Sequence, residues 1–381
     1  MKKMLTTLIA LMGFAALMAQ DLSKIKVLND STFQNNKTYQ QGNKYQRDAM
    51  LFVDMLADTH PYYIQKERRE ALLAGQQRLL ADCARCESDS VFVQLLIRTL
   101  GPLHDKHTGV VEPSKLAAQK RKQQRDAQAP KASGDEGMMA YKGDLFHYTI
   151  DAAHALCYLQ FNQCMDARTA RNEALPRWDK LLAEMFAKLK EQGIKTLVVD
   201  AQYNNGGSSR LCDELMAYLC PLDKLHNLTT YLRFSRLMAA YNPRVGVAKQ
   251  AWEAKGHVDE LYRMPAGKLP ANFVQPEVFD GKVIFVQGRR TFSSAGILMT
   301  LARDNHIGII VGSTSTYSPS HYGEVMPYRL PNTNILGSIC SKYFVRPDRA
   351  HAEDKTLEPD VPIDLSDKQA AWEQILRIAK Q

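Results

Sequence analysis

The segment KVIFVQGRRTFSSAGILMTLARDNHIGIIVGS, residues 282–313, decides the fold of this chain. An apolar run of strand length covers residues 283–286, and Gly288 breaks it. Apolar residues then recur at helical spacing over residues 297–301, before a second apolar run at residues 307–311. The pattern predicts the order strand, turn, helix, strand, which is typical of an α/β fold.

Two serines, Ser293 and Ser294, stand where the predicted strand turns into the predicted helix. A serine at a helix start lies among unpaired backbone N–H groups at the positive end of the helix dipole. Such groups can hold a developing oxyanion, so the position suits a nucleophile. Serine and threonine are also common N-cap residues, and a simple helix cap is the alternative interpretation of this turn.

A second turn follows another apolar strand in the segment TLVVDAQYNNGGSS, residues 196–209. The strand ends at Asp200, and the turn contains Gly206 and Gly207. Glycines permit positive φ angles and a close approach of backbone to its surroundings. The free N–H groups of such a turn can face an anion.

Together, these two segments resemble the tail-specific, or C-terminal processing, serine protease family, which includes the core of the tricorn protease. The family motif Asp-Leu-Arg-x-Asn-x-Gly-Gly is similar to residues 200–207, although this chain lacks the Leu and the Arg. The motif Thr-x-Ser-Ala-x-Glu is similar to residues 291–296, where Gly296 replaces the Glu. The resemblance covers most of the chain after Ala155.

The resemblance implies a ClpP/crotonase-like α/β catalytic core in which Ser293 is the nucleophile. One branch of the family activates the serine with a lysine from the loop after the second strand, but residues 283–341 contain no lysine. The tricorn-like branch uses a histidine from an Asp-Gly-His-Thr motif, and this chain reads DKHT at residues 105–108. On this basis His107 is the general base. His321 remains a rival base, and a structural histidine at a helix end is the other interpretation of His107.

A third group must orient the imidazole and stabilise its cation. The tricorn-like branch places a Glu shortly before its terminal Pro-Asp, so the resemblance implies Glu353, with Asp354 as the alternative. The surrounding mixed-charge run is also typical of a turn that faces water. We expect the oxyanion hole to consist of the backbone N–H of Ser294 and that of Gly206 or Gly207.

The length of 381 residues and the hydrophobic pattern predict several structural units. Helical spacing indicates an N-terminal helical domain over residues 39–111. Residues 112–140 form a basic linker that we expect to be exposed or flexible. The protease-like α/β core then covers residues 141–381. Many relatives carry a peptide-binding PDZ module at the linker, but this gap is shorter than the roughly 40 residues that fold unaided, so we expect no PDZ module.

The N-terminus has the pattern of a secretory signal peptide over residues 1–19. Lys2 and Lys3 precede an apolar run at residues 4–18, and Ala19 ends a plausible cleavage site. We therefore expect an exported protein, periplasmic or extracellular, with no stable membrane insertion after signal removal. A retained membrane anchor is the alternative, although the run is shorter than the roughly 20 residues of a membrane span.

Composition excludes some other classes of function. The seven cysteines include the pair Cys83 and Cys86, but no second ligand pair accompanies it, so we expect neither a metal nor another cofactor. The formal net charge is +8, and the basic run of the linker lacks the aromatic pattern of nucleic-acid binding, so we expect no nucleic-acid partner.

Two hypotheses of function follow from the resemblance. The first is an exported serine endopeptidase that acts on a peptide or protein substrate through Ser293, His107 and Glu353. The alternative is a catalytically inactive relative that binds peptides or apolar ligands in the same cleft, as in the related interphotoreceptor retinoid-binding proteins. The absent Arg and Glu of the two motifs favour the alternative, and the Ser, the His-Thr pair and the double glycine favour the enzyme.

Overall fold

The computed structural model describes residues 22–128, 137–267 and 273–381, which fold into two compact units. Unit 1 comprises Met1–Gln128, Thr230–Pro265 and Tyr322–Phe344, and unit 2 comprises the remaining segments. The predicted signal peptide lies outside the described residues. Among the described helices, none is both long enough and apolar enough to cross a membrane.

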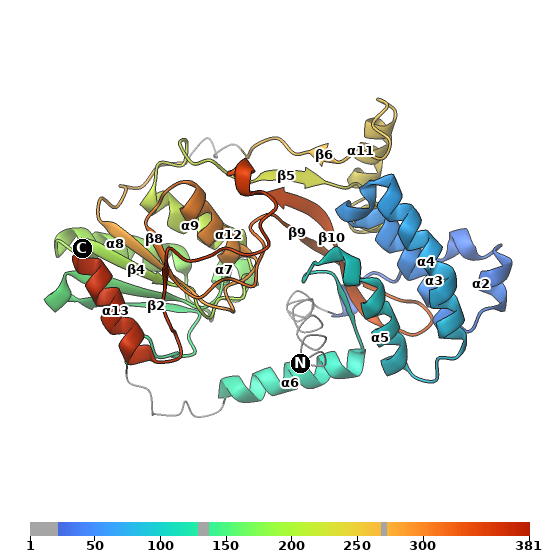
Figure 1. Ribbon diagram of the computed structural model, residues 1–381, viewed down its shortest axis with the longest axis horizontal. Coiled ribbons are helices and arrows are strands. Elements are labelled where there is room, and N and C mark those ends of the chain that lie inside the picture. Colours follow the sequence, from blue (N-terminus) through green and yellow to red (C-terminus); the bar gives the residue numbers. More distant parts are fainter. Residues whose placement is uncertain (1–21, 129–136, 268–272) are drawn as a thin grey trace. The chain divides into compact units, whose positions relative to one another are not determined.

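Unit 2 is built on a six-stranded sheet (Figure 1). Neighbouring strands are parallel except β2 and β3, which form an antiparallel pair. The strands follow in the order β11 (Val361–Pro362), β8 (Ile309–Gly312), β7 (Lys282–Gln287), β4 (Thr196–Asp200), β3 (Leu156–Phe161) and β2 (Phe146–Asp151).

Helices cover both faces of this sheet. Leu197 and Val199 of β4 belong to a buried cluster with residues of α8 (Trp178–Glu191), α9 (Ser209–Leu219) and α12 (Ser294–Asp304). The intervening Val198 belongs to a second cluster with residues of α13 (Lys368–Lys380). Because both faces are buried, the strands are continuous apolar runs rather than alternating ones. The elements β7, α12 and β8 follow one another in the predicted order.

Unit 1 combines helices with a second sheet. The helices are α2 (Lys37–Gln41), α3 (Lys44–Thr59), α4 (Lys66–Ala84), α5 (Asp89–Thr99), α6 (Pro113–Gln128), α10 (Arg236–Tyr241) and α11 (Pro243–Glu253). The sheet has the order β1 (Gly109–Val111), β10 (Leu336–Val345), β5 (Thr229–Leu232) and β6 (Tyr262–Arg263), with β9 (His321–Arg329) also paired to β10. Buried residues of α3 to α5 share one apolar core with Tyr328 and Ile339 of the sheet.

The remaining elements are short. They are the helix α7 (Ala167–Ala170) and the 3₁₀ turns Leu22–Lys24, Ser31–Phe33, Pro61–Ile64, Gly101–Leu103, Ala152–His154 and Arg349–His351.

The structure differs from the predicted domain limits in two places. Residues 230–265 and 322–344 belong to unit 1 and not to one continuous core, because β1 pairs with β10 and brings those segments into the first unit. The predicted flexible linker is largely the helix α6. Its Lys, Arg, Gln and Ala are strong helix formers, and Leu116 is buried against Ile25, Val111 and Leu336.

Candidate active site

Ser293 lies at the N-cap position of α12 with φ 54° and ψ −125°. This backbone conformation is strained for a residue with a side chain, and such strain clusters at functional sites. The Ser293 hydroxyl makes no hydrogen bond to the first N–H groups of the helix, and the residue is partly exposed. The simple N-cap is therefore not the role of this side chain. A serine nucleophile on a sharp strand-to-helix turn has this same setting.

The turn between β4 and α9, residues 201–207, packs directly on the turn that carries Ser293, residues 288–293. We call these the glycine turn and the Ser293 turn. A Cβ atom on Gly206 would lie only 2.6 Å from the Cβ of Ser293 and 2.8 Å from the carbonyl oxygen of Phe292. The N–H of Phe292 donates to the carbonyl of Asn204 over 3.0 Å. Because β4 and β7 are parallel neighbours, their carboxyl ends bring the two turns together.

Gly207 lies between Cys164 and Ser294 and contacts both residues. Its φ of 136° is suited to glycine, and a Cβ there would lie 2.4 Å from the carbonyl oxygen of Cys164. The hydroxyl of Ser294 donates to the carbonyl of Gly207 over 2.8 Å. The second serine of the pair thus ties the start of α12 to the glycine turn.

These contacts distinguish between the two predicted oxyanion donors of the glycine turn. The N–H of Gly206 donates to the side-chain oxygen of Asn204 over 2.8 Å and is therefore engaged. Within the part of the chain that the structure describes, the N–H groups of Gly207 and Ser294 have no protein acceptor. The geometry favours Ser294 and Gly207 as the pair of donors.

Gly296 stands where the family has a Glu, and another side chain occupies the space beside it. A Cβ on Gly296 would lie 2.3 Å from the ring of Tyr317, so the ring occupies the space beside this glycine. Burial raises the pKa of Tyr317 well above its usual value. Its hydroxyl lies 2.5 Å from Nδ1 and 2.8 Å from Nε2 of His321, which is itself buried. The rival base His321 is thus the hydrogen-bonding partner of a buried tyrosine.

His107 belongs to unit 1, in the segment before β1 that we call the His107 loop, residues 104–108. Its N–H donates to Oδ1 of Asp105 over 2.9 Å, and its carbonyl accepts from the hydroxyl of Ser338 over 2.9 Å. Nδ1 of the ring lies 3.5 Å from Oδ1 of Asp105, and the side chain is 12% exposed. A partly exposed imidazole beside a carboxylate is the arrangement of a general base.

Glu353, the predicted third catalytic group, is exposed to solvent, whereas His107 is largely buried beside a carboxylate. The side chain of Glu353 is 90% exposed in unit 2, and its carboxylate lies 3.7 Å from the ammonium group of Lys355. Asp354 lies 3.2 Å from Nδ1 of His351 and 3.5 Å from Arg346. This is the geometry of a solvated charged turn, and the role of Glu353 stays a prediction.

Sequence reasoning missed Asp105 as a residue of the site. A signal was present, because an Asp commonly accepts hydrogen bonds from the backbone two or three residues later. Asp105 stands two residues before His107 and accepts from the N–H groups of His107 and Thr108. Nothing in the local sequence indicates the pairing of Tyr317 with His321.

Comparisons with known proteins give one family model and several solved structures of similar fold. The model of the family described as Peptidase family S41 matches residues 155–363. Mature CPAF complexed with lactacystin is 14% identical, with a TM-score of 0.57, over 88% of this chain and 97% of that chain. A candidate peptidase from Parabacteroides merdae is 14% identical, with a TM-score of 0.55, over 88% and 97%. The photosystem II D1 C-terminal processing protease is 13% identical, with a TM-score of 0.50, over 89% and 98%. No curated protein matches this sequence.

Proposed function

The chain belongs to peptidase family S41 and is a serine peptidase, and we propose that it cleaves peptide bonds as an endopeptidase through an acyl-enzyme on Ser293. The observation that carries this proposal is the Ser293 hydroxyl, which is partly exposed on a strained turn and not used as a helix cap. The two N–H groups of Ser294 and Gly207 support it, because both are available to an oxyanion.

In the proposed reaction, the Ser293 hydroxyl attacks the carbonyl carbon of a peptide bond while His107 accepts the hydroxyl proton. The carbonyl oxygen becomes an oxyanion, which the N–H groups of Ser294 and Gly207 stabilise. The C–N bond then breaks, and His107 returns the proton to the leaving amine. Water attacks the resulting ester with His107 again as the base, and Ser293 is regenerated.

One observation favours a second candidate function. Gly296 supplies no carboxylate at the position of the family's Glu, and the ring of Tyr317 fills the space beside it. An inactive relative that binds peptides or apolar ligands in its cleft would tolerate this change. The labelling experiment below separates the two functions.

The test is covalent labelling of the folded protein with a fluorophosphonate, followed by intact mass. We expect one adduct on the wild type, none on Ser293→Ala, and labelling slowed by at least about a hundredfold in His107→Asn, because the base is lost. His104→Asn is the matched control, since His104 is an exposed histidine of the same loop. It should label at the wild-type rate.

A folded wild type that takes no adduct would support the inactive relative. Equal slowing in His104→Asn and His107→Asn would mean that the loop, and not the imidazole of His107, supports acylation.

The intact mass also tests the proposed export. Protein recovered from the periplasm or the medium should lack residues 1–19, and a retained N-terminus would contradict signal-peptide cleavage.

A further inference from the structure

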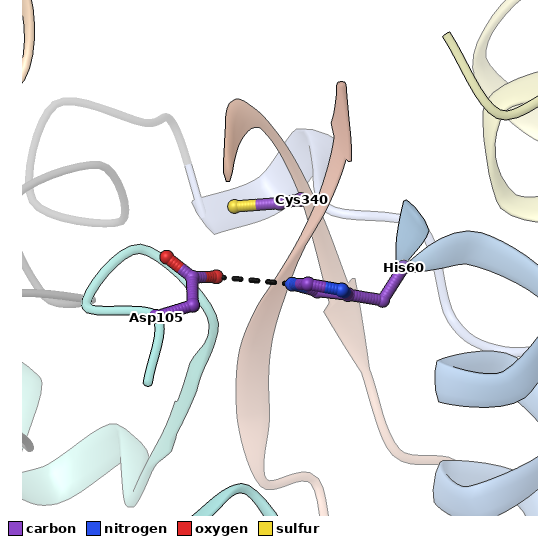
Figure 2. Close-up of side chains that lie close together, drawn as sticks. All are labelled: His60, Asp105 and Cys340. Atoms are coloured by element: carbon purple, nitrogen blue, oxygen red, sulfur yellow. Dashed lines mark hydrogen bonds and ion pairs between the residues drawn. The ribbon is translucent and has the colours of Figure 1, made fainter. Parts of the chain in front are cut away.

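A buried group of ligand-type side chains lies beside His107 within unit 1. Nε2 of His60, a carboxylate oxygen of Asp105 and the thiol sulfur of Cys340 all lie within 4.8 Å of one another. Figure 2 shows the three side chains, with the imidazole of His60 directed at the carboxylate of Asp105. His60 is the C-cap residue of α3, Asp105 lies in the His107 loop, and Cys340 lies in β10.

One observation argues against a metal site in this group. Nδ1 of His60 accepts a hydrogen bond from the N–H of Tyr62 over 3.1 Å, so the proton of the neutral ring sits on Nε2, which faces Asp105. A metal-binding histidine has the opposite arrangement, with the second nitrogen donating to an acceptor.

The group is instead a hydrogen-bond network centred on Asp105, whose side chain is only 2% exposed. Oδ2 accepts from Nε2 of His60 over 3.2 Å and from the N–H of Thr108 over 3.0 Å. Oδ1 accepts from the N–H of His107 over 2.9 Å, and the thiol sulfur of Cys340 lies within 4.8 Å of the carboxylate. Both oxygens thus accept hydrogen bonds from donors of unit 1.

One contact of this network reaches the imidazole itself. Nδ1 of His107 lies 3.5 Å from the same Oδ1 that holds the His107 backbone. A carboxylate at this distance orients the ring with Nδ1 towards it and Nε2 turned away.

We propose that Asp105, supported by His60 and Cys340, is the positioning residue that orients His107 and stabilises its cation. This role rests on the proposed function, in which His107 is the general base, and it gives to Asp105 the part that the sequence resemblance gives to Glu353. His60 acts at one remove, since it donates to Asp105 and keeps its carboxylate in place, and Cys340 lies beside the same carboxylate.

The charges around the network agree with this role. Burial raises the pKa of Asp105, but hydrogen bonds from His107 and His60 outweigh burial and hold the pKa well below its usual value. Burial lowers the pKa of His60, so this ring is a neutral donor and not a second cation. Among the described residues, the other titratable or charged side chains that interact with members of the network are Arg233, Tyr322 and Glu324, and Lys106 follows Asp105 in the sequence.

The first measurement does not depend on activity. Diethyl pyrocarbonate modifies unprotonated imidazole, and peptide mass spectrometry reports the pH midpoint of modification at His107. In Asp105→Asn we expect this midpoint to fall, because the carboxylate beside Nδ1 is gone. The fluorophosphonate rate should fall by about tenfold or more, and the acid limb of its pH profile should move to lower pH by the same amount.

Asp48→Asn is the matched control. Asp48 is another fully buried carboxylate of unit 1, and it accepts four hydrogen bonds from Asn332 and Thr333 without belonging to the His107 network. Its loss should lower the melting temperature but leave the His107 midpoint and the pH profile unchanged. A midpoint that stays at the wild-type value in folded Asp105→Asn would overturn the proposal.

Further outcomes separate this proposal from others. If the wild type takes no fluorophosphonate adduct while the midpoint still falls in Asp105→Asn, the proposed function fails and the pairing of Asp105 with His107 stands. If Glu353→Gln moves the midpoint and Asp105→Asn does not, Glu353 has the role proposed for Asp105. A rise in melting temperature with Zn²⁺ that both Asp105→Asn and Cys340→Ala abolish would identify a metal site and overturn the network.

Discussion

The Ser293 turn and the His107 loop hold their side chains in different ways. In unit 2, backbone geometry fixes Ser293: its φ is positive, and Gly206 and Gly207 allow the glycine turn to approach within contact distance. In unit 1, a buried carboxylate fixes His107 through its backbone N–H and its ring. The first region depends on the absence of side-chain atoms, and the second depends on the presence of a charge.

This difference predicts which changes each region tolerates. An added methyl group should be the most harmful change to the glycine turn, and its effect should not depend on pH. Replacing the charged carboxylate of Asp105 by a neutral group should be the most harmful change to the His107 loop, and its effect should depend on pH.

The largest effect is expected for Gly206→Ala. The new Cβ would lie 2.6 Å from the Cβ of Ser293, and the φ of 93° adds backbone strain. We expect a loss of about 3 kcal/mol in the free energy of unfolding and a fluorophosphonate rate lowered by at least about a hundredfold. Urea unfolding and labelling kinetics measure the two quantities.

Gly193→Ala is the control for strain alone. Gly193 also has a positive φ, 63°, but a Cβ there meets nothing within 4 Å. It should cost about 1 kcal/mol and leave labelling at the wild-type rate. Wild-type labelling in Gly206→Ala would show that the glycine turn does not hold Ser293.

The two regions also differ in how far the sequence predicts them. The strand, turn and helix around Ser293 were predictable because apolar runs and helical spacing are local signals, and they are confirmed by β7, α12 and β8. The membership of residues 322–344 in unit 1 was not predictable, because it depends on the pairing of Gly109 with Ser338 across distant sequence. No local pattern records such a pairing.

Within the candidate site, motif positions were easier to predict than contacts. The motifs located Ser293 and the two glycines on adjoining turns, but they could not show that Asn204 engages the N–H of Gly206. The network of Asp105 was missed for the same reason, since His60 and Cys340 come from distant parts of the sequence. Helix α6 was missed because a polar, basic run has the composition of both a linker and an exposed helix.

An intermediate effect is expected for the stability of Asp105→Asn. The pKa of Asp105 in the folded protein lies well below the value of about 3.9 that an unfolded chain has. Its carboxylate therefore stabilises the fold above about pH 4, and this stabilisation is lost as the pH falls towards the folded pKa. We expect Asp105→Asn to lose about 2 kcal/mol at pH 7, and the difference from wild type should shrink below about pH 4.

Urea unfolding between pH 3 and pH 7 measures this dependence. Asp48→Asn should show the opposite sign, because burial raises the pKa of Asp48 and the charged form is the less favoured one in the fold. Its difference from wild type should therefore be larger at low pH than at neutral pH. A difference for Asp105→Asn that is constant with pH would mean that the carboxylate acts through shape and not through charge.

The smallest effects are expected for a matched pair of serine variants. Ser294→Ala removes a hydroxyl that donates to Gly207 over 2.8 Å, and Ser338→Ala removes one that donates to His107 over 2.9 Å. Each should cost about 1 kcal/mol in the free energy of unfolding.

Ser294→Ala should slow labelling by several fold, because it frees the peptide that carries a proposed oxyanion donor. Ser338→Ala should slow it less, because Asp105 still holds the loop by two backbone N–H groups. Labelling that is slower in Ser338→Ala than in Ser294→Ala would reverse the comparison, since the hydroxyl and not the carboxylate would then be the main support of His107.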